Sequence, residues 1–155
     1  MVEIKTIDNN QLKSDITDFI LHQLPDWFGI EESIQEYIKS VKGKVFYAVY
    51  DNNDVVGFIC LKINSPYTAE IYVMGILEPY HRHGIGRNLV NIAEQYIKEN
   101  HYKFFMVKTL GESSDDESYR KTRAFYRSVG FYPLEEIKEI WGEENPCLIM
   151  IKHIV

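Results

Sequence analysis

Two glycines, Gly84 and Gly86, stand in a turn between an apolar strand and a helix, and this turn is where the sequence most directly indicates chemistry. Glycine tolerates positive φ and lets a ligand approach the backbone closely. A helix that begins here has unpaired amide N–H groups and a partial positive charge in its first turn, which favours a phosphate or pyrophosphate. The segment 81–86 (HRHGIG) therefore predicts an anion-binding cradle, although two glycines can also mark only a tight connection.

Basic side chains surround the predicted cradle. We expect the backbone N–H groups from Arg82 to Gly86, including those of His83 and Ile85, to bind the pyrophosphate, with Arg82 and Arg87 adding charge. The same arginines could instead be solvated side chains at a helix start. Two histidines two residues apart do not predict a metal site, because no nearby Asp, Glu or Cys supplies the spacing that three or four ligands require. We therefore expect no metal and place His81 and His83 in the phosphate loop.

Two familiar phosphate-binding motifs are excluded by the residues that follow the turn. A dinucleotide fingerprint needs a third glycine, and Leu89 stands at that position. A P-loop needs Gly-Lys-Ser/Thr, whereas Gly86 is followed by Arg87 and Asn88. What remains is a strand, a proline, a short basic segment, G-x-G and a helix.

This arrangement resembles the acetyl-CoA-binding core of the GCN5-related N-acetyltransferase (GNAT) family, whose signature is Gln/Arg-x-x-Gly-x-Gly/Ala. One position departs from it, because His81 occupies the Gln/Arg place. A second family pattern is matched by Ala124-Phe125-Tyr126 followed by Gly130-Phe131. Both motifs at the expected separation are more specific than either alone.

The resemblance implies that acetyl-CoA is the co-substrate and that an amine acceptor attacks its thioester directly, with no enzyme nucleophile. It also implies that the strand 71–77 splays from the one that starts at Lys103, so that the pantetheine arm bonds to exposed backbone. Gly75 fits such a break. A backbone N–H near Ile76 or Leu77 would face the thioester oxygen as a one-donor oxyanion site.

Two side chains take catalytic roles by the same resemblance. Glu70 lies eleven residues before His81, where the histone acetyltransferase branch carries a glutamate general base. The alternatives are an exposed carboxylate at a strand end, with a water chain accepting the proton. Tyr126 stands at the family position whose hydroxyl meets the cofactor sulfur and protonates or stabilises the thiolate, and its alternative is a core tyrosine.

The elements that must position these residues follow from apolar periodicity. We expect strands at 2–7, 44–50, 55–63, 69–77, 103–110 and 147–154, and helices after Asn9, around 34–41, from about 85 and from about 117. Asp8 or Asn9 would cap the first helix, and Ser114 with Glu117 would form a capping box for the last, which Gly130 ends. The segment 103–110 (KFFMVKTL) is apolar enough for a strand covered on both faces. The order is that of an α/β acyl-CoA N-acyltransferase fold, a central mixed sheet with splayed parallel strands flanked by helices.

Composition narrows the functional class. The 155 residues predict a single domain, 1–155. A net charge of -6 argues against a nucleic-acid partner, which would need dense Lys and Arg stripes. No signal peptide or membrane-length apolar run is visible, so we expect a cytoplasmic protein, a monomer or homodimer, without a membrane partner. Cys60 and Cys147 form no motif and are expected to be reduced packing residues.

The acceptor must bind where the cofactor core leaves room. Trp27 and Phe28, the acidic segment 112–117 and Trp141 combine aromatic walls with carboxylates, which suits a small cationic amine. Trp27 and Phe28 could also fill the core. Two functional hypotheses stay open: an acetyl-CoA-dependent N-acetyltransferase, acting on a small amine or on a protein lysine or N-terminus, and a non-catalytic acyl-CoA-binding or sensing module.

Overall fold

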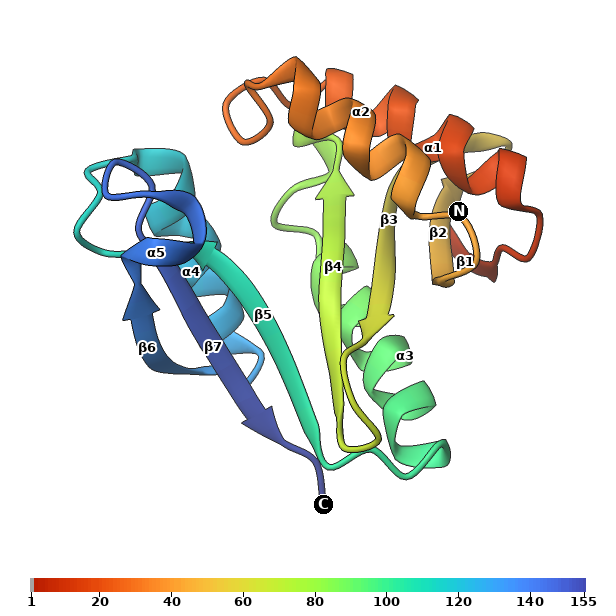
Figure 1. The fold of residues 1–155 in the computed structure, drawn as a ribbon. Coiled ribbons are helices and arrows are strands. Elements are labelled where there is room, and N and C mark those ends of the chain that lie inside the picture. The colour runs from red at the N-terminus through yellow and green to blue at the C-terminus, as the bar shows by residue number, and fades with distance from the viewer. Residues whose placement is uncertain (1) are drawn as a thin grey trace. The chain divides into compact units, whose positions relative to one another are not determined.

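The computed structural model describes residues 2–155, and Figure 1 shows their helices and strands. Along the chain these are β1 (Val2–Thr6), α1 (Asn10–His22), α2 (Glu31–Ser40), β2 (Val45–Asp51), β3 (Asp54–Ile63), β4 (Thr68–Ile76), the 3-10 turn η1 (Glu78–Tyr80), α3 (Ile85–Glu99), β5 (Phe104–Leu110), α4 (Glu117–Ser128), β6 (Tyr132–Ile137), α5 (Lys138–Trp141) and β7 (Cys147–His153).

The strands form a mixed sheet in the order β1-β2-β3-β4-β5-β7-β6. β4 and β5 pair in parallel, whereas β1 with β2, β2 with β3, β5 with β7 and β6 with β7 pair antiparallel. The predicted α/β class with a central mixed sheet flanked by helices is therefore confirmed.

Two compact units divide the described chain, and both β4 and α3 contribute to each of them. The first unit contains the residues up to Lys62 together with Tyr72–Gln95. The second contains Ile63–Ile71 together with Tyr96–Val155. Each unit is described separately below.

In the first unit, α1 and α2 lie side by side against β2, β3 and the end of β4 (Figure 1). Asn9 caps α1, since its side chain accepts the Leu12 N–H at 2.8 Å, as the sequence predicts. A Cβ added to Gly75 would lie 2.9 Å from Ile20 of α1 and 3.2 Å from Leu24. Gly75 therefore lets α1 approach the strand closely, which is a packing reason for this glycine. The core here contains Ile16, Ile20, Leu21, Phe46, Ala48, Phe58, Cys60 and Val73.

In the second unit, the parallel pairing aligns Thr68–Ile71 of β4 with Phe104–Val107 of β5. The burial of β5 alternates: Phe105, Val107 and Thr109 are buried, whereas Phe104 is exposed. The expectation of a strand fully covered on both faces is therefore wrong. The apolar composition of the segment does not show how far each face of the strand is covered. Successive side chains of a strand point to opposite faces, and the second face of β5 carries Met106 and Lys108, which are both half-buried.

The start of α4 also differs from the prediction. Asp116 is the N-cap, and its carboxylate accepts the Tyr119 N–H at 3.1 Å. Ser114 and Glu117 therefore do not form the expected capping box, because the helix begins at Glu117 itself. Aspartate and serine are equally good N-cap residues, so the sequence offered two competing starts.

Candidate active site

The glycine turn after β4 has the backbone geometry of an open cradle. Gly84 has a φ of +79°, and a Cβ built there would meet no atom within 4 Å. α3 begins at the next residue, and its first intrahelical hydrogen bond runs from the Asn88 N–H to the Gly84 carbonyl at 3.1 Å. The N–H groups of Ile85 and Gly86 precede that bond and point out of the helix start. The turn before a helix is confirmed, and its anion-binding role stays a prediction.

Charged side chains of the loop lie at the surface. Arg82, His83 and Arg87 are exposed. Arg82 has a φ of +65°, in the left-handed region that residues other than glycine seldom adopt. His83 borders a hollow of about 570 Å³ that is also lined by Tyr80 and Asn88. The first unit thus places two guanidinium groups and an imidazole around the Gly84 turn.

His81, which is expected to form part of the basic phosphate loop, makes a side-chain contact within the protein. Its Nε2 lies 2.6 Å from the carbonyl oxygen of Ile76, at the end of β4. Because a carbonyl only accepts, Nε2 is the protonated ring nitrogen in this contact. The ring is turned toward its own strand, and this contact was not predictable from the sequence because it depends on how η1 folds back.

Hydrogen bonding at the end of β4 distinguishes the two predicted oxyanion donors, Ile76 and Leu77. The Leu77 N–H is donated to the Val56 carbonyl of β3 at 2.9 Å, so it is already used within the sheet. Successive residues of a strand direct their N–H groups to opposite sides. The Ile76 N–H therefore points to the side of β4 away from β3. Of the pair, Ile76 therefore stays the candidate donor, and its oxyanion role stays a prediction.

Glu70 is buried in the second unit, with 4% of its surface exposed, so the alternative of an exposed strand-end carboxylate is wrong. Asn64 donates its side-chain N–H to Glu70 Oε1 at 2.8 Å. Lys108 Nζ lies 3.6 Å from Oε2. The β4–β5 register aligns Glu70 with Met106, which puts Glu70 and Lys108 on the same face of the sheet. An amide and an ammonium group thus compensate the burial of this carboxylate.

Asn64 and Lys108 were not predicted as site residues. A lysine within the apolar strand 103–110 was the available signal, since a charge in a largely buried strand needs a counter-charge. Nothing in the sequence pointed to Asn64, which lies in the loop between β3 and β4, directly before Ser65 and Pro66.

Tyr126 lies on α4 and is 8% exposed. Its ring meets Phe131 edge to face, with the centroids 5.8 Å apart, and Phe131 meets Phe105 of β5 at 5.0 Å. Gly130, with a φ of +103°, lets the chain reverse after α4 so that Phe131 returns to the helix. This explains the spacing of the second motif as packing. The ring of Tyr126 belongs to the core, and the catalytic role of its hydroxyl stays a prediction.

Arg123, one turn before Tyr126 on α4, is a further residue that sequence reasoning missed. Its Nη1 donates to the carbonyls of Leu110 and Gly111, at 2.6 and 3.1 Å. The guanidinium is buried and closes the C-terminal end of β5 against α4. Arg123 therefore fixes the helix that carries Tyr126.

The candidate acceptor residues are placed as follows. In the first unit, Trp27 and Phe28 are half-buried and pack against the core cluster. Trp27 meets His81 edge to face at 5.5 Å, and Phe28 meets Tyr37 of α2 at 6.1 Å. In the second unit, Trp141 ends α5 and is 42% exposed. That these residues share one pocket stays a prediction.

Both cysteines are buried. Burial raises the pKa of the Cys60 thiol to about 12, and burial also raises the pKa of Cys147. Thiols with raised pKa values are protonated at neutral pH and are poor nucleophiles. This favours a reaction in which the acceptor attacks directly.

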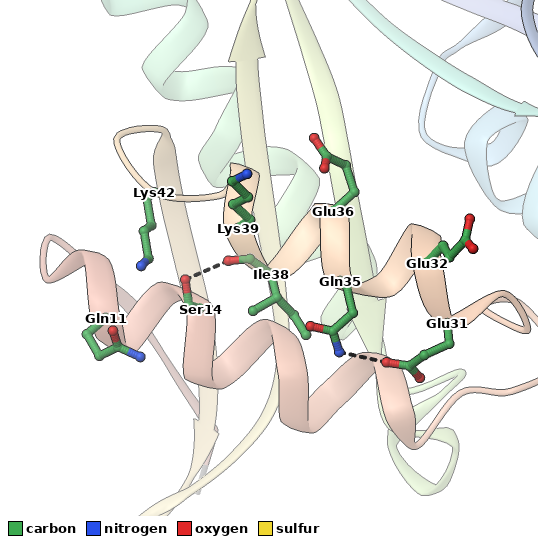
Figure 2. Close-up of a pocket in the computed structure, with 9 residues that line it drawn as sticks. All are labelled: Gln11, Ser14, Glu31, Glu32, Gln35, Glu36, Ile38, Lys39 and Lys42. Atoms are coloured by element: carbon green, nitrogen blue, oxygen red, sulfur yellow. Dashed lines mark hydrogen bonds between the residues drawn. The ribbon is translucent and has the colours of Figure 1, made fainter.

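A second hollow, of about 560 Å³, lies along the outer side of α1 and α2 (Figure 2). Its carboxylates Glu31, Glu32 and Glu36 lie toward one end, and Lys39 and Lys42 lie toward the other. Within the hollow, the side-chain amide of Gln35 donates a hydrogen bond to Glu31 Oε2 at 2.6 Å. None of the predicted site residues lines this hollow. Because its lining contains both carboxylates and ammonium groups, its charge does not indicate one class of ligand.

In residues 2–155, no three His, Cys, Asp or Glu side chains gather as a metal-binding group would. None of the helices in that range has the length and apolar character needed to cross a membrane.

Comparison with known proteins gives both sequence and structural relatives. Over 79 residues the chain is 27% identical to "Probable N-acetyltransferase 14" of Xenopus tropicalis, a match that covers 50% of this chain and 38% of that protein. The fold is similar to an aminoglycoside 6'-N-acetyltransferase solved with coenzyme A, with a TM-score of 0.78, 18% identity and coverage of 99% and 97% of the two chains. It is also similar to the ribosomal-protein-S18-alanine N-acetyltransferase of Escherichia coli, with a TM-score of 0.75, 15% identity and coverage of 99% and 94%.

A family model covers most of the chain. The model described as the acetyltransferase (GNAT) family matches residues 13–131, which include most of α1, the glycine turn, Glu70 and the whole Tyr126 motif. The chain therefore belongs to the GNAT acetyltransferase family.

Proposed function

We propose that this protein is an acetyl-CoA-dependent N-acetyltransferase, acting as one domain over residues 1–155, in which a small amine acceptor attacks the thioester directly. The observation that carries the proposal is the Gly84 turn: a left-handed glycine with open space around its Cβ position, directly before the start of α3. Its position at the family motif and the family membership of the chain support its assignment as the pyrophosphate cradle. When bound, acetyl-CoA supplies the activated acetyl group.

The residues of the first unit bind the phosphates of acetyl-CoA and polarise its acetyl carbonyl. The N–H groups at the start of α3 hold phosphate oxygens, and the guanidinium groups of Arg82 and Arg87 add positive charge. The Ile76 N–H donates to the acetyl carbonyl oxygen, where negative charge develops during attack. One such donor can be worth about 3 kcal/mol.

The residues of the second unit handle protons. A primary amine has a pKa of about 10.4, so it must lose a proton before it attacks. Glu70 accepts that proton, and Asn64 and Lys108 hold its carboxylate in place. Tyr126 gives a proton, or a hydrogen bond, to the departing thiolate.

A small cationic amine is the proposed acceptor. The net charge of -6 and the half-buried aromatic rings of Trp27 and Phe28 favour a cation over an anion. The aminoglycoside and protein-alanine acetyltransferases of similar fold show that the fold serves both small-molecule and protein acceptors. A panel of aminoglycosides, polyamines, aromatic monoamines and short peptides, assayed for free thiol released from acetyl-CoA, distinguishes these acceptors from a sensing module without turnover.

The cradle is tested by thermal denaturation with acetyl-CoA. We expect acetyl-CoA to raise the melting temperature of the wild type and Gly84→Val to lose this shift, because the branched side chain occupies the phosphate space. Gly43→Val is the matched control: Gly43 has a φ of +78° and an equally open Cβ position, but it lies in the loop after α2. Both variants carry the same backbone strain. A wild type without a shift at millimolar acetyl-CoA, or equal shifts in the two variants, would contradict the cradle.

A further inference from the structure

His81 makes three contacts within the protein, one through its backbone N–H and two through its imidazole ring. Its own N–H is donated to the Glu78 carbonyl at 3.0 Å, which closes η1. Its Nε2 reaches the Ile76 carbonyl at 2.6 Å. Its ring meets Trp27, with centroids 5.5 Å apart and planes at 75°.

The contact with Ile76 lies beside the proposed oxyanion donor. The N–H and C=O of one strand residue point to the same side of the strand. The imidazole therefore holds the peptide carbonyl of the residue whose N–H is proposed to polarise the thioester. The Ile76 carbonyl shares its peptide unit with the Leu77 N–H, which is donated to Val56, so His81 makes the second of two hydrogen bonds that fix this peptide at the end of β4.

The contact with Trp27 reaches the loop between α1 and α2. That loop is anchored from α1, since the N–H groups of Trp27 and Phe28 are both donated to the Leu24 carbonyl, at 3.1 and 2.9 Å. His81 is directly followed by Arg82 in its left-handed conformation and by the Gly84 turn. One residue thus joins the phosphate loop, the end of β4 and a candidate acceptor wall within the first unit.

We propose that His81 is a positioning residue that couples the cofactor loop to the acceptor loop: its Nε2–H holds the Ile76 carbonyl, and its ring holds Trp27. The proposal rests on the acetyl-transfer function proposed above. It assigns to His81 a role within the protein rather than a direct contact with acetyl-CoA.

Two substitutions separate the two contacts. His81→Phe keeps an aromatic edge for Trp27 but has no donor for Ile76, so we expect turnover to fall about tenfold with the acceptor KM unchanged. His81→Gln keeps an N–H donor but lacks the ring, so we expect the acceptor KM to rise about tenfold with turnover largely kept. The acceptor is the best amine from the panel above. A residue that only stabilised the fold would not divide its effects between kcat and KM in this way.

A second readout needs no turnover. The chain has two tryptophans, so in a Trp141→Phe background the emission reports Trp27 alone. We expect acetyl-CoA to change this emission, to change it less in His81→Gln, and to change it as in the parent protein in His81→Phe. If acetyl-CoA gives neither a thermal shift nor an emission change in the parent protein, the proposed function fails. If the thermal shift is present and the emission response is identical in all three proteins, the coupling by His81 is overturned.

A double-mutant cycle covers the case in which His81→Phe does not fold. Trp27→Leu and His81→Gln should each raise the acceptor KM, and the double variant should raise it no further than either single variant, because both remove the same contact. Independent, multiplicative effects on KM would overturn the proposal.

Discussion

At the scale of single residues, the buried carboxylate of Glu70 has two possible roles, as a structural ion-pair partner and as the general base. As an ion-pair partner of Lys108 it would matter only for folding. As the base it must be able to accept a proton from the acceptor. The two roles can be separated because either partner of the pair can be changed alone.

We expect Glu70→Gln to lower turnover by about 10² to 10⁴, the usual contribution of general base catalysis. The loss should shrink as pH rises, because more of the acceptor amine is then already neutral. Lys108→Met is the control, since it removes the ion pair at 3.6 Å but leaves the carboxylate. Steady-state rates between neutral and alkaline pH measure both. Equal rate losses in the two variants would assign Glu70 to structure.

Tyr126 combines a core ring with a candidate catalytic hydroxyl. Because the ring contacts with Phe125 and Phe131 do not need the hydroxyl, Tyr126→Phe should leave the acetyl-CoA thermal shift nearly unchanged and lower kcat. Phe131→Leu is the packing control, which should lower the melting temperature more than kcat. A Tyr126→Phe enzyme with wild-type kcat would return Tyr126 to the core alone.

At the scale of elements, a histidine joins the end of α1 to the start of α2. His22 Nε2 lies 2.8 Å from Glu31 Oε1, and Nδ1 lies 2.8 Å from Asp18 Oδ1. The hydrogen bond with Glu31, then that with the Asp18 backbone, raises the pKa of His22 above its ordinary value of 6.5. Hydrogen bonds from Gln35 and from His22 lower the pKa of Glu31.

A raised folded-state pKa means that the folded protein binds the His22 proton more tightly than the unfolded chain. The stabilisation is therefore fully present below the unfolded pKa of about 6.5 and is lost as pH rises through the folded pKa. We expect the melting-temperature advantage of the wild type over His22→Gln to be larger near pH 6 than near pH 8, roughly the range in which histidine titrates. The effect is small because the pair is exposed to solvent. A pH-independent difference would contradict this linkage.

Element boundaries show how far sequence reasoning extends. The Gly84 turn was predictable because a single local rule applied to it. The exact helix starts were not, since Asp8 and Asn9 satisfy the same capping rule before α1, and Ser114 and Asp116 satisfy it before α4. The surroundings of Glu70 were equally inaccessible, because Asn64 and Lys108 reach it only through the register of β4 against β5. The inward turn of His81 depends on η1, a bend for which the sequence offered only Pro79.

At the scale of the whole molecule, the net charge of -6 acts on every charged ligand. It attracts a cationic acceptor over several ångströms, and salt screens this attraction. We expect kcat/KM for a polyamine or aminoglycoside acceptor to fall as ionic strength rises. A monoamine acceptor, which carries a single positive charge, should show a weaker dependence. Rates measured from low to physiological salt test this, and equal salt dependence would count against electrostatic attraction.

The sharing of β4 between two compact units has a consequence for synthesis on the ribosome. A nascent chain that has emerged as far as Gln95 contains every residue of the first unit. Thr68–Ile71, in contrast, must wait for Phe104–Val107 before it gains its parallel partner, and parallel pairing across a helical crossover forms slowly. During that interval β4 presents an unpaired strand edge, which is a template for pairing with other chains. We therefore expect products truncated shortly after α3 to aggregate more readily than the full chain.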